Sequence, residues 1–244
     1  MNYTATPHPE WLDRTGMLIN ADNLSKLRSS HVLVAGLGGV GGYAADMLCR
    51  AGIGRLTIVD GDTVQVTNRN RQLLAICSNE GRPKTEVMAE RLRDINPDVQ
   101  IETINEFLRD ERMIEVVSRR YDYVIDAIDT LSPKIFLLCH ALKNNLRIVS
   151  SMGAGGKLDP LKILVDDISK TYNCKLAQNV RKRLGKLGVT TGIKAVFSAE
   201  QIDKKLVVPC EEQNKRSIVG TISYLPAIFG CVCASVVIRD LIDL

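Results

Sequence analysis

Short apolar runs alternate with amphipathic stretches between residue 31 and about residue 151. The apolar runs are typical of strands buried in a parallel sheet, and they occupy residues 31–36, 55–60, 100–104, 121–127 and 146–151. The stretches between them predict helices over about residues 40–51, 85–95, 110–119 and 132–144. This alternation, with crossovers long enough for parallel pairing, predicts an α/β fold with a doubly wound, Rossmann-like, mostly parallel sheet.

The pattern becomes less regular after residue 160. Its expected elements are a strand at 162–165, a basic helix around 175–187, a strand at 193–198 and a mobile polar loop at 200–217. We therefore expect a core with an N-terminal helical arm over residues 1–160 and an additional α+β C-terminal segment over residues 161–244. The two parts are expected to pack as one domain.

Residues 218–238 form a run of 21 residues without a charge, which is long enough to span a bilayer. Pro226, Gly220 and Gly230 interrupt this run, and no aromatic belt brackets both of its ends. These features favour a core helix from about Leu225, buried in the domain or against a second subunit. No membrane span is expected.

Composition supports a globular protein in a reducing compartment. The chain has 244 residues, a formal net charge of +4, 45% hydrophobic residues and 25% charged residues, which fits one large domain and argues against disorder. Its seven cysteines are odd in number and lie among apolar runs, which favours a reducing environment. Because charged residues are spread through the first 30 positions, we expect no secretory signal and predict a cytoplasmic protein.

A glycine-rich segment links the first predicted strand to the helix that follows it. Gly36, Gly38 and Gly41 satisfy the pattern G-x-G-x-x-G, and Gly39 adds a fourth glycine. Glycines let the backbone approach a phosphate, and the helix N-terminus supplies free N–H groups. Asp60 closes the next strand, 24 residues after Gly36, where it is placed to bind ribose hydroxyls. The alternative is that the glycines serve only a tight turn.

The residues after Asp60 distinguish between nucleotides. Two amides and two guanidiniums lie in residues 68–72, and Lys84 follows where a loop meets a helix. A triphosphate and its leaving pyrophosphate need such cations, whereas a dinucleotide needs few of them, so ATP is favoured over NAD. The residues expected at the nucleotide are Asp62, Asn68, Asn70, Arg71 and Lys84. Alternatively, the cations are solvated surface charges.

Two carboxylates follow the predicted strand at 121–127, at the edge where ligands bind in open sheets. Asp129 lies beyond the strand, and we expect it to hold Mg²⁺ against the phosphates. Asp126 is open to two interpretations, since it could contribute to the metal site or cap the loop that follows.

These motifs resemble the adenylation domain of the ubiquitin-activating-enzyme superfamily, which includes MoeB, ThiF and HesA. The resemblance covers residues 10–244 and rests on Arg14, GLGGVG at 36–41, DGDTV at 60–64, NRNRQ at 68–72, Lys84 and DAID at 126–129. The shared reaction of this superfamily is attack of a carboxylate on the α-phosphate of ATP, giving an acyl-adenylate and pyrophosphate.

Within the superfamily, the chain is most similar to the tRNA threonylcarbamoyladenosine dehydratases. The similar segments are GRPKTEVMAERLRDINP at 81–97, SSMGAGGKLDP at 150–160, DISKT at 167–171 and VRKRL at 180–184. The resemblance implies that ATP activates the carboxylate of threonylcarbamoyladenosine in the tRNA anticodon loop, which then closes into a ring with net loss of water. The pair Asn173-Cys174 and the linker at 199–216 depart from the pattern of this branch.

The resemblance also implies a role for each motif. Gly38, Gly39 and Gly41 would line the nucleotide, and Asp60 would hold the ribose. The phosphates would be contacted by Asn70, Arg71 and Lys84, and Asp129 would serve Mg²⁺. Arg14 matches an arginine that superfamily members insert into the site of the partner subunit, which implies a homodimer. The expected catalytic set is Arg14, Arg71, Lys84 and Asp129.

Two features separate the chain from its sulfur-transferring relatives. MoeB and ThiF hold a structural zinc with two CxxC pairs, whereas the spacing of Cys231 and Cys233 would point their thiols to different sides of a helix, so no zinc is expected. Seven basic residues and no acid lie between Asp167 and Glu200, which fits a tRNA backbone better than a small carrier protein. The expected tRNA contacts are Lys175, Arg181, Lys182, Arg183 and Lys186, unless these form an ordinary solvated helix face.

Three alternative functions stay open. Adenylation of the C-terminal carboxylate of a ubiquitin-like sulfur carrier is disfavoured by the missing zinc cysteines, and an NAD-dependent oxidoreductase is disfavoured by Arg71 and Lys84. A non-catalytic nucleotide-binding adaptor is disfavoured because every polar position of the site is filled. Cys210 matches a position where relatives often keep an acyl- or sulfur-accepting cysteine, but the neighbouring Glu211 and Glu212 disfavour a thiolate, so we interpret it as an incidental thiol. The sequence leaves open a monovalent cation and a sulfur-handling protein partner.

Overall fold

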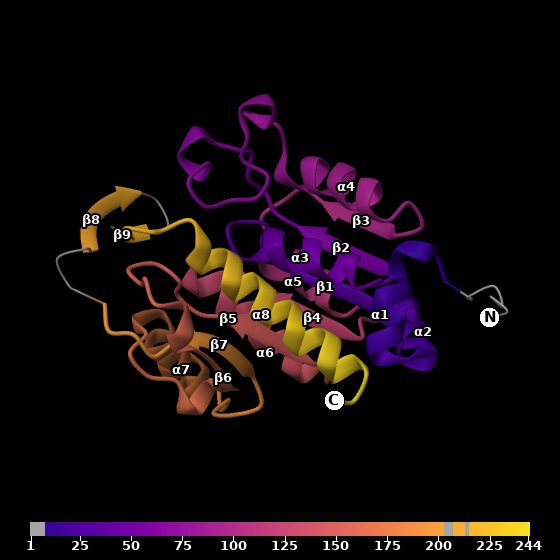
Figure 1. The fold of residues 1–244 in the computed structure, drawn as a ribbon. Helices are drawn as coiled ribbons and strands as arrows, with labels where there is room; N and C mark the ends of the chain where they lie inside the picture. The colour runs from indigo at the N-terminus through magenta and orange to yellow at the C-terminus, as the bar shows by residue number, and fades with distance from the viewer. Residues whose placement is uncertain (1–7, 203–206, 213–214) are drawn as a thin grey trace, which may run out of the picture.

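The computed structural model of the protein describes residues 8–202, 207–212 and 215–244, with the backbone alone at 207–212 and 215–218. Its centre is a seven-stranded sheet with the strand order β3-β2-β1-β4-β5-β7-β6 (Figure 1). The strands are β1 (His31–Ala35), β2 (Arg55–Val59), β3 (Gln100–Ile104), β4 (Tyr123–Asp126), β5 (Ile148–Ser151), β6 (Ile163–Asp167) and β7 (Lys194–Ser198).

The strand pairing is parallel except at one edge. Neighbouring strands in the series β3-β2-β1-β4-β5-β7 all pair in parallel, and β6 pairs antiparallel with β7 at the edge. The central strands β1, β4 and β5 are buried along almost their whole length, which explains their continuous apolar sequences. The predicted doubly wound, mostly parallel α/β sheet is confirmed.

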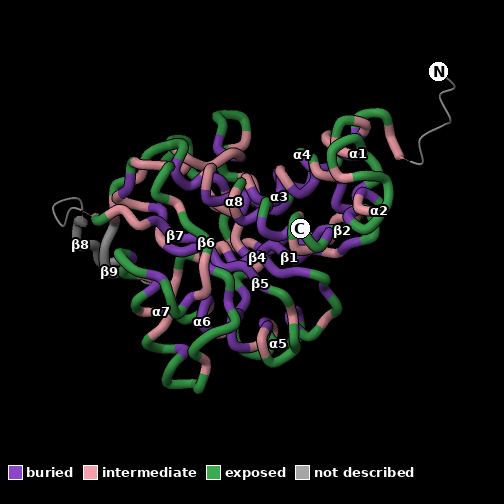
Figure 2. The backbone as a smooth tube through the Cα atoms, turned by 60° about the horizontal axis from the view of Figure 1, so that its bottom comes forward, coloured by how far each residue is buried: buried purple, intermediate pink, exposed green. Residues whose placement is uncertain are grey.

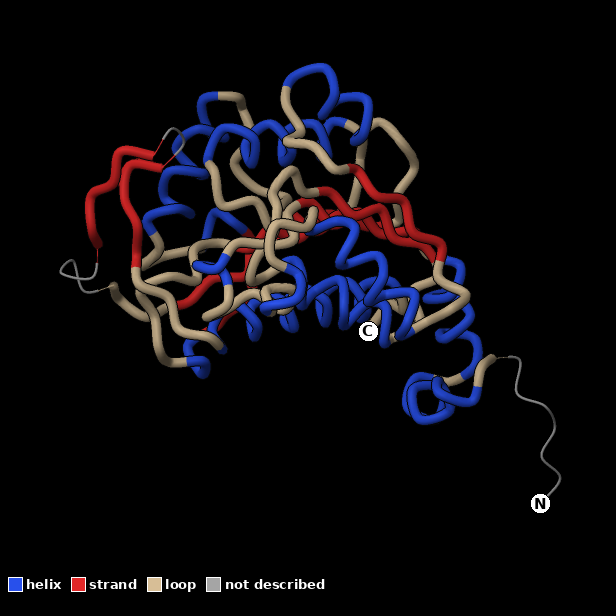
Figure 3. The backbone as a smooth tube through the Cα atoms, turned by 90° about the horizontal axis from the view of Figure 1, so that it is seen from above, coloured by secondary structure: helices blue, strands red, loops and turns tan. Residues whose placement is uncertain are grey.

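Helices cover both faces of the sheet (Figures 2 and 3). One face carries α3 (Gly41–Arg50), α4 (Lys84–Ile95) and α8 (Tyr224–Leu241), and the other carries α5 (Asp110–Val117), α6 (Leu131–Lys143) and α7 (Lys175–Lys186). Alternate residues of β1 face the two cores, since Val32 and Val34 belong to the first and Leu33 and Ala35 to the second. The segment 161–244 thus adds strands and helices to the same sheet.

The N-terminal arm lies at the amino edge of the sheet. It consists of η1 (Glu10–Leu12), α1 (Asp13–Ile19) and α2 (Ala21–Ser29), and α2 leads directly into β1. The Asn20 side chain accepts a hydrogen bond from the Asn23 N–H at 2.9 Å and so caps α2. Leu12 is buried against Gly52, just past the C-terminus of α3, so the arm is fixed at the end of α3 that is distant from the glycine loop.

Helix α8 is the core helix predicted from the apolar C-terminal run. By length and composition it could cross a membrane, but it packs on α3 and on strands β4, β5 and β7. Gly230 makes this contact close, because a Cβ atom there would lie 2.3 Å from the Val40 carbonyl oxygen. The C-terminal end of α8 is tied to the sheet by Asp240, which accepts hydrogen bonds from the Tyr123 hydroxyl at 2.6 Å and from the Lys194 ammonium.

The prediction of a mobile loop at 200–217 was wrong over its second half. Residues of this segment form β8 (Val207–Glu212) and β9 (Lys215–Val219), which pair antiparallel as a separate two-stranded sheet. The pairing satisfies backbone N–H and C=O groups between the two strands, and the sequence of the segment lacks the regular apolar alternation that would have predicted strands. Cys210 lies in β8, and its side chain lies outside the described part of the structure.

Replacing Gly230 by alanine is expected to destabilise the protein by about 1–3 kcal/mol, because the methyl group would force α8 away from α3. Urea denaturation of the wild type and the variant measures this difference. Gly185→Ala is the matched control: a Cβ there meets nothing within 4 Å, so it should stabilise helix α7 by at most about 1 kcal/mol. Equal stabilities of G230A and G185A would contradict the close packing of α8.

Candidate active site

Most of the residues predicted to bind the nucleotide follow the carboxyl ends of β2, β1 and β4, which are neighbours in the sheet. The glycine loop and Asp129 follow β1 and β4. The chain leaves β1 toward α3 on one face and leaves β4 toward α6 on the other, so this is the topological switch point of the fold. The glycine loop after β1 lies against the turn at residues 126–130, since a Cβ atom at Gly36 would lie 2.8 Å from the Ala127 carbonyl oxygen. Ligands of doubly wound sheets bind in this crevice.

The structural reason for a glycine differs among the four glycines of the loop. Gly36 has a φ of 91°, and a Cβ atom at Gly41 would lie 1.7 Å from the Gly36 carbonyl oxygen, so a tight turn demands both residues. Gly39 packs against Pro226 of α8, at 2.9 Å from where its Cβ would be. At Gly38 the nearest atom would be the Gln72 side-chain amide nitrogen at 3.8 Å. The chain's own packing therefore leaves room at Gly38, where a ligand could approach the backbone.

Asp60 is fixed by backbone donors at the end of β2. Its Oδ2 accepts the Leu37 N–H at 2.7 Å, and its Oδ1 accepts the Asp62 N–H at 2.8 Å. Burial raises the pKa of Asp60, while the Lys84 ammonium, 3.9 Å from Oδ2, and the two N–H groups oppose the shift. The carboxylate thus orients the first turn of the glycine loop.

Lys84 is the first residue of α4, at the junction of loop and helix that the sequence predicts. Its side chain is 4% exposed, and its Nζ donates to Asp62 Oδ2 at 3.0 Å. The Lys84 backbone N–H also bonds to the Asp62 carbonyl, at 3.0 Å. The ammonium is therefore held between Asp60 and Asp62 and is not a solvated surface charge.

Residues 68–72 form a cluster next to the segment that leads into α8. Asn68 Oδ1 accepts the Gln65 N–H at 3.2 Å, and the Asn70 amide donates to the Thr221 carbonyl at 2.9 Å. Arg71 is half-buried, and its Nη1 bonds to the Thr67 carbonyl and to Asn70 Oδ1. Arg69 differs from it, because its guanidinium forms a surface ion pair with Glu80 at 2.6 Å.

Of the two interpretations of Asp126, the structure supports a role in holding the loop that follows β4. Its carboxylate is fully buried and pairs with the fully buried Lys134 of α6 at 2.7 Å. It also accepts hydrogen bonds from the Ser150 hydroxyl and from the Ile128 N–H at 3.1 Å, and Lys134 donates to the Ile128 carbonyl at 3.0 Å. Asp126 therefore holds the turn at residues 126–130 in place and is not available to a metal ion. Sequence reasoning missed Lys134, because only the packing of α6 brings it under β4.

A second buried lysine was also missed. Lys157 is 2% exposed, and its ammonium donates to the carbonyls of Asn173, Ser198 and Glu200 at 3.3, 2.9 and 2.7 Å. Burial lowers the pKa of Lys157, partly opposed by Glu200. Lys157 ties the segment after β5 to the end of β7, which fixes the backbone beside the crevice.

The remaining predicted residues lie on the surface around this edge or away from it. Asp129 is exposed in the turn after β4, and Arg14 is exposed on α1 in the N-terminal arm. Of the five cations predicted to contact tRNA, Lys175, Lys182, Arg183 and Lys186 are exposed on α7. Arg181 is half-buried and bonds to the Thr171 hydroxyl, so it also anchors the helix.

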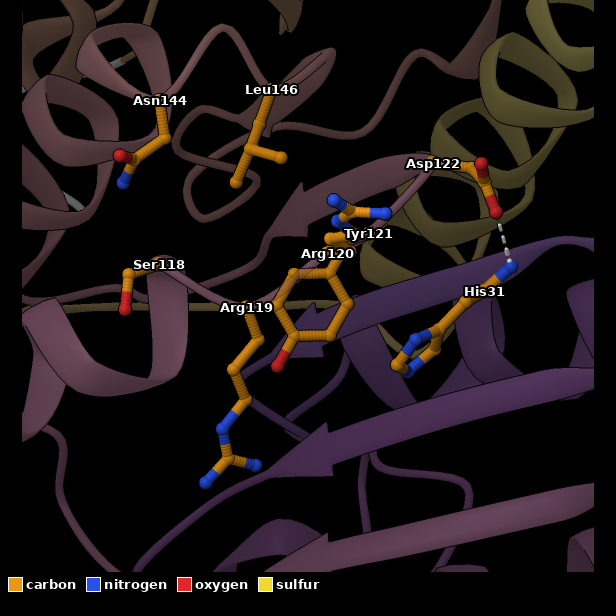
Figure 4. A pocket seen from close by; sticks show the side chains of 8 residues that line it. All are labelled: His31, Ser118, Arg119, Arg120, Tyr121, Asp122, Asn144 and Leu146. Carbon is orange, nitrogen blue, oxygen red and sulfur yellow. Dashed lines mark hydrogen bonds between the residues drawn. The ribbon is translucent and has the colours of Figure 1, made fainter.

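A cavity of about 540 Å³ lies at the opposite, amino edge of the sheet (Figure 4). It is lined by residues that precede or begin the strands, among them His31, Arg119 and Asp122. Asp122 accepts the His31 N–H at 2.7 Å, and Arg119 pairs with Glu102 and Glu115. None of the predicted site residues lines this cavity, so it is separate from the switch point.

Mononucleotides and dinucleotides bind at switch points of this kind, and the fold with this site places the chain in the class of nucleotide-binding α/β proteins. Residues 12–243 match the model of the ThiF family, and the chain belongs to that family. The resemblance to the ubiquitin-activating-enzyme superfamily is thereby confirmed.

The chain is similar to several tRNA threonylcarbamoyladenosine dehydratases, and the similarity covers most of the length of those in bacteria. The chain is 37% identical to tRNA threonylcarbamoyladenosine dehydratase of Bacillus subtilis over 237 residues, which is 94% of this chain and 93% of the relative. It is 41% identical to the Escherichia coli protein of the same name over 199 residues, covering 77% and 73%. The crystal structure of the E. coli enzyme TcdA in complex with ATP superposes with a TM-score of 0.87 at 35% identity, covering 94% and 93%.

Lys134→Met is expected to lower the free energy of unfolding by about 3–5 kcal/mol, because it leaves the Asp126 carboxylate buried without its cation. Chemical denaturation measures the loss. Adding Asp126→Asn to this variant removes the uncompensated charge and should recover part of the stability. If the effects of the two substitutions on the free energy of unfolding simply added, so that the double variant were less stable than K134M, the stability would not depend on the ion pair.

Proposed function

We propose that the protein is an ATP-dependent tRNA threonylcarbamoyladenosine dehydratase. In this reaction ATP activates the carboxylate of threonylcarbamoyladenosine as an acyl-adenylate, with release of pyrophosphate, and ring closure then releases AMP. The observation that carries the proposal is the similarity to dehydratases over more than nine-tenths of the chain, including a structure in complex with ATP. The motif residues on which the resemblance rests, apart from Arg14, also follow the carboxyl ends of the neighbouring strands β2, β1 and β4 or begin the helix α4.

The residues present fit a bound nucleotide. The space at Gly38 lets a phosphate approach the backbone, and the α3 N-terminus, whose N-cap residue Val40 makes no side-chain cap, offers N–H groups. Asp60 would bind the ribose hydroxyls through lone pairs that its two backbone donors leave unused. Asn70, Arg71 and Lys84 would contact the phosphates and stabilise the charge that develops as pyrophosphate leaves.

Asp129 would hold Mg²⁺, since it is an exposed carboxylate in a turn whose backbone the buried Asp126–Lys134 pair fixes. When bound, Mg²⁺ would neutralise phosphate charge and orient the triphosphate. With Asp126 committed to Lys134, Asp129 is the carboxylate of this turn that suits the role.

Arg14 would act in the site of a partner subunit, which makes the active form a homodimer. The arm that carries Arg14 is fixed at the C-terminal end of α3, whereas the glycine loop precedes its N-terminus. A ten-residue helix is about 15 Å long, so Arg14 is placed to reach another subunit's nucleotide more readily than its own.

The exposed cations of α7 would contact the phosphates of tRNA. Lys175, Lys182, Arg183 and Lys186 lie on a helix without an acidic residue, and this density of charge suits a polyanion. We further propose that the protein works in the cytoplasm, where its tRNA substrate and a reducing environment for its cysteines are found.

The deciding experiment measures ATP consumption, with AMP and pyrophosphate as products, in the presence of tRNA that carries or lacks the threonylcarbamoyl group. We expect consumption and a loss of 18 Da from the modified nucleoside, about one water, only with the modified tRNA. Consumption that ignores the modified tRNA but rises with a diglycine-ended carrier protein would overturn the proposal in favour of a sulfur-carrier adenylating enzyme.

Arg71→Ala is expected to reduce the rate of adenylate formation by about 10²–10³-fold, because it removes a half-buried cation from the phosphates. The exchange of labelled pyrophosphate into ATP measures this rate. Arg69→Ala is the matched control, since the neighbouring arginine pairs with Glu80 on the surface and its loss should leave the rate within about two-fold. Equal effects of R71A and R69A would show that Arg71 is no site residue.

A further inference from the structure

A groove of about 560 Å³ runs between α6 and α7, outside the residues assigned so far to the nucleotide. Its floor is apolar and includes Ile135, Cys139 and Leu142 of α6, with Leu187 and Val189 following α7. Its volume lies in the range of sites that hold small organic groups, about 300–1,000 Å³. The groove is therefore large enough to bury a planar heterocycle.

An aromatic pair projects into the groove from α6. Phe136 and His140 lie one helical turn apart, and their ring centroids are 4.3 Å from one another at an interplanar angle of 37°. Burial and the Lys143 ammonium lower the pKa of His140, so its ring is uncharged at neutral pH. Both side chains are only half-buried, which leaves an aromatic face open to a ligand.

The rim of the groove is cationic. Arg183 of α7 reaches across it, and its Nη1 donates to the Ser132 hydroxyl at 3.0 Å. Lys143 lies at the other end of α6, and none of the described residues that line the groove is acidic. A half-buried aromatic platform with cations on both sides is complementary to a base and its flanking phosphates.

The groove adjoins the site at the switch point. Ser132, at one end of the groove, is the second residue of α6 and follows the 126–130 turn that carries Asp129. Arg183 belongs at the same time to the exposed cations of α7. A nucleic acid that lies along α7 with one nucleotide at the switch point would therefore pass over the groove.

We propose that the α6–α7 groove binds an unpaired base of the tRNA anticodon loop, a neighbour of the nucleotide that reacts. The base stacks on Phe136 and His140, and Arg183 and Lys143 contact the phosphates beside it. This inference rests on the proposed function and adds a base-binding subsite to it. A second protein chain suits the groove less well, because two cations with no lining acid would disfavour an apolar partner surface.

The test uses the full-length protein and the modified tRNA. Phe136→Leu keeps the apolar volume but removes the aromatic face, and it should raise the KM for tRNA at least about five-fold while the KM for ATP stays unchanged. Phe136→Tyr retains the ring and should restore the wild-type KM. Ile114→Ala, at an exposed apolar position on α5, is the matched control and should change neither constant.

Binding of a fluorescently labelled anticodon stem-loop, followed by anisotropy, separates stacking from turnover. The affinity of F136L should fall by the same factor as its KM rises, with thermal unfolding midpoints showing that the variant is folded. An F136L protein with wild-type affinity and KM would overturn the subsite and leave the proposed function intact. If the wild type does not convert the modified tRNA at all, the proposed function fails instead.

Discussion

Asp126 and Lys134 form an ion pair that is wholly buried beneath the carboxyl edge of the sheet. Two opposite charges taken out of water need hydrogen-bond partners besides each other, and here Ser150 and both backbone groups of Ile128 supply them. The network fixes the turn after β4, and the Ala127 carbonyl of that turn lies against Gly36. The shape of the crevice between β1 and β4 therefore depends on this pair, although neither residue is proposed to touch the nucleotide.

Close backbone packing connects the turn after β4, the glycine loop and helix α8. Gly39 lies against Pro226, and Gly230 lies against the start of α3, so the glycine loop is held between the turn after β4 and helix α8. Asn70 extends the same arrangement through its hydrogen bond to the Thr221 carbonyl just before α8. The apolar C-terminal run, which by length alone could also span a membrane, thus forms the helix that packs against the glycine loop.

The α6–α7 side of the molecule has a different character. There the helices leave an apolar groove with cations at its rim, next to a helix that carries four exposed basic residues. A protein that acts on one nucleotide within a folded RNA needs both an electrostatic surface for phosphates and a place for a splayed base. The proposed nucleotide site therefore lies at the carboxyl edge of the sheet beside α3 and α8, and the proposed RNA contacts lie on the face that carries α6 and α7.

Local patterns in the sequence were enough to predict the alternation of strands and helices, the glycine loop, the acid at the end of β2 and Lys84 at the start of α4, because each of these has a fixed period or spacing. It also led to the ThiF family, since its motifs follow one another in order. The folded chain was needed to show that Asp126 is structural, that Arg71 and Arg69 have different surroundings, and that the segment after Glu200 contains two paired strands. These outcomes depend on contacts between residues distant in the chain, such as Ser150 with Asp126, or on backbone pairing that leaves no periodic trace. Burial and partners, which decide what a charged side chain can do, arise only when those distant segments pack together.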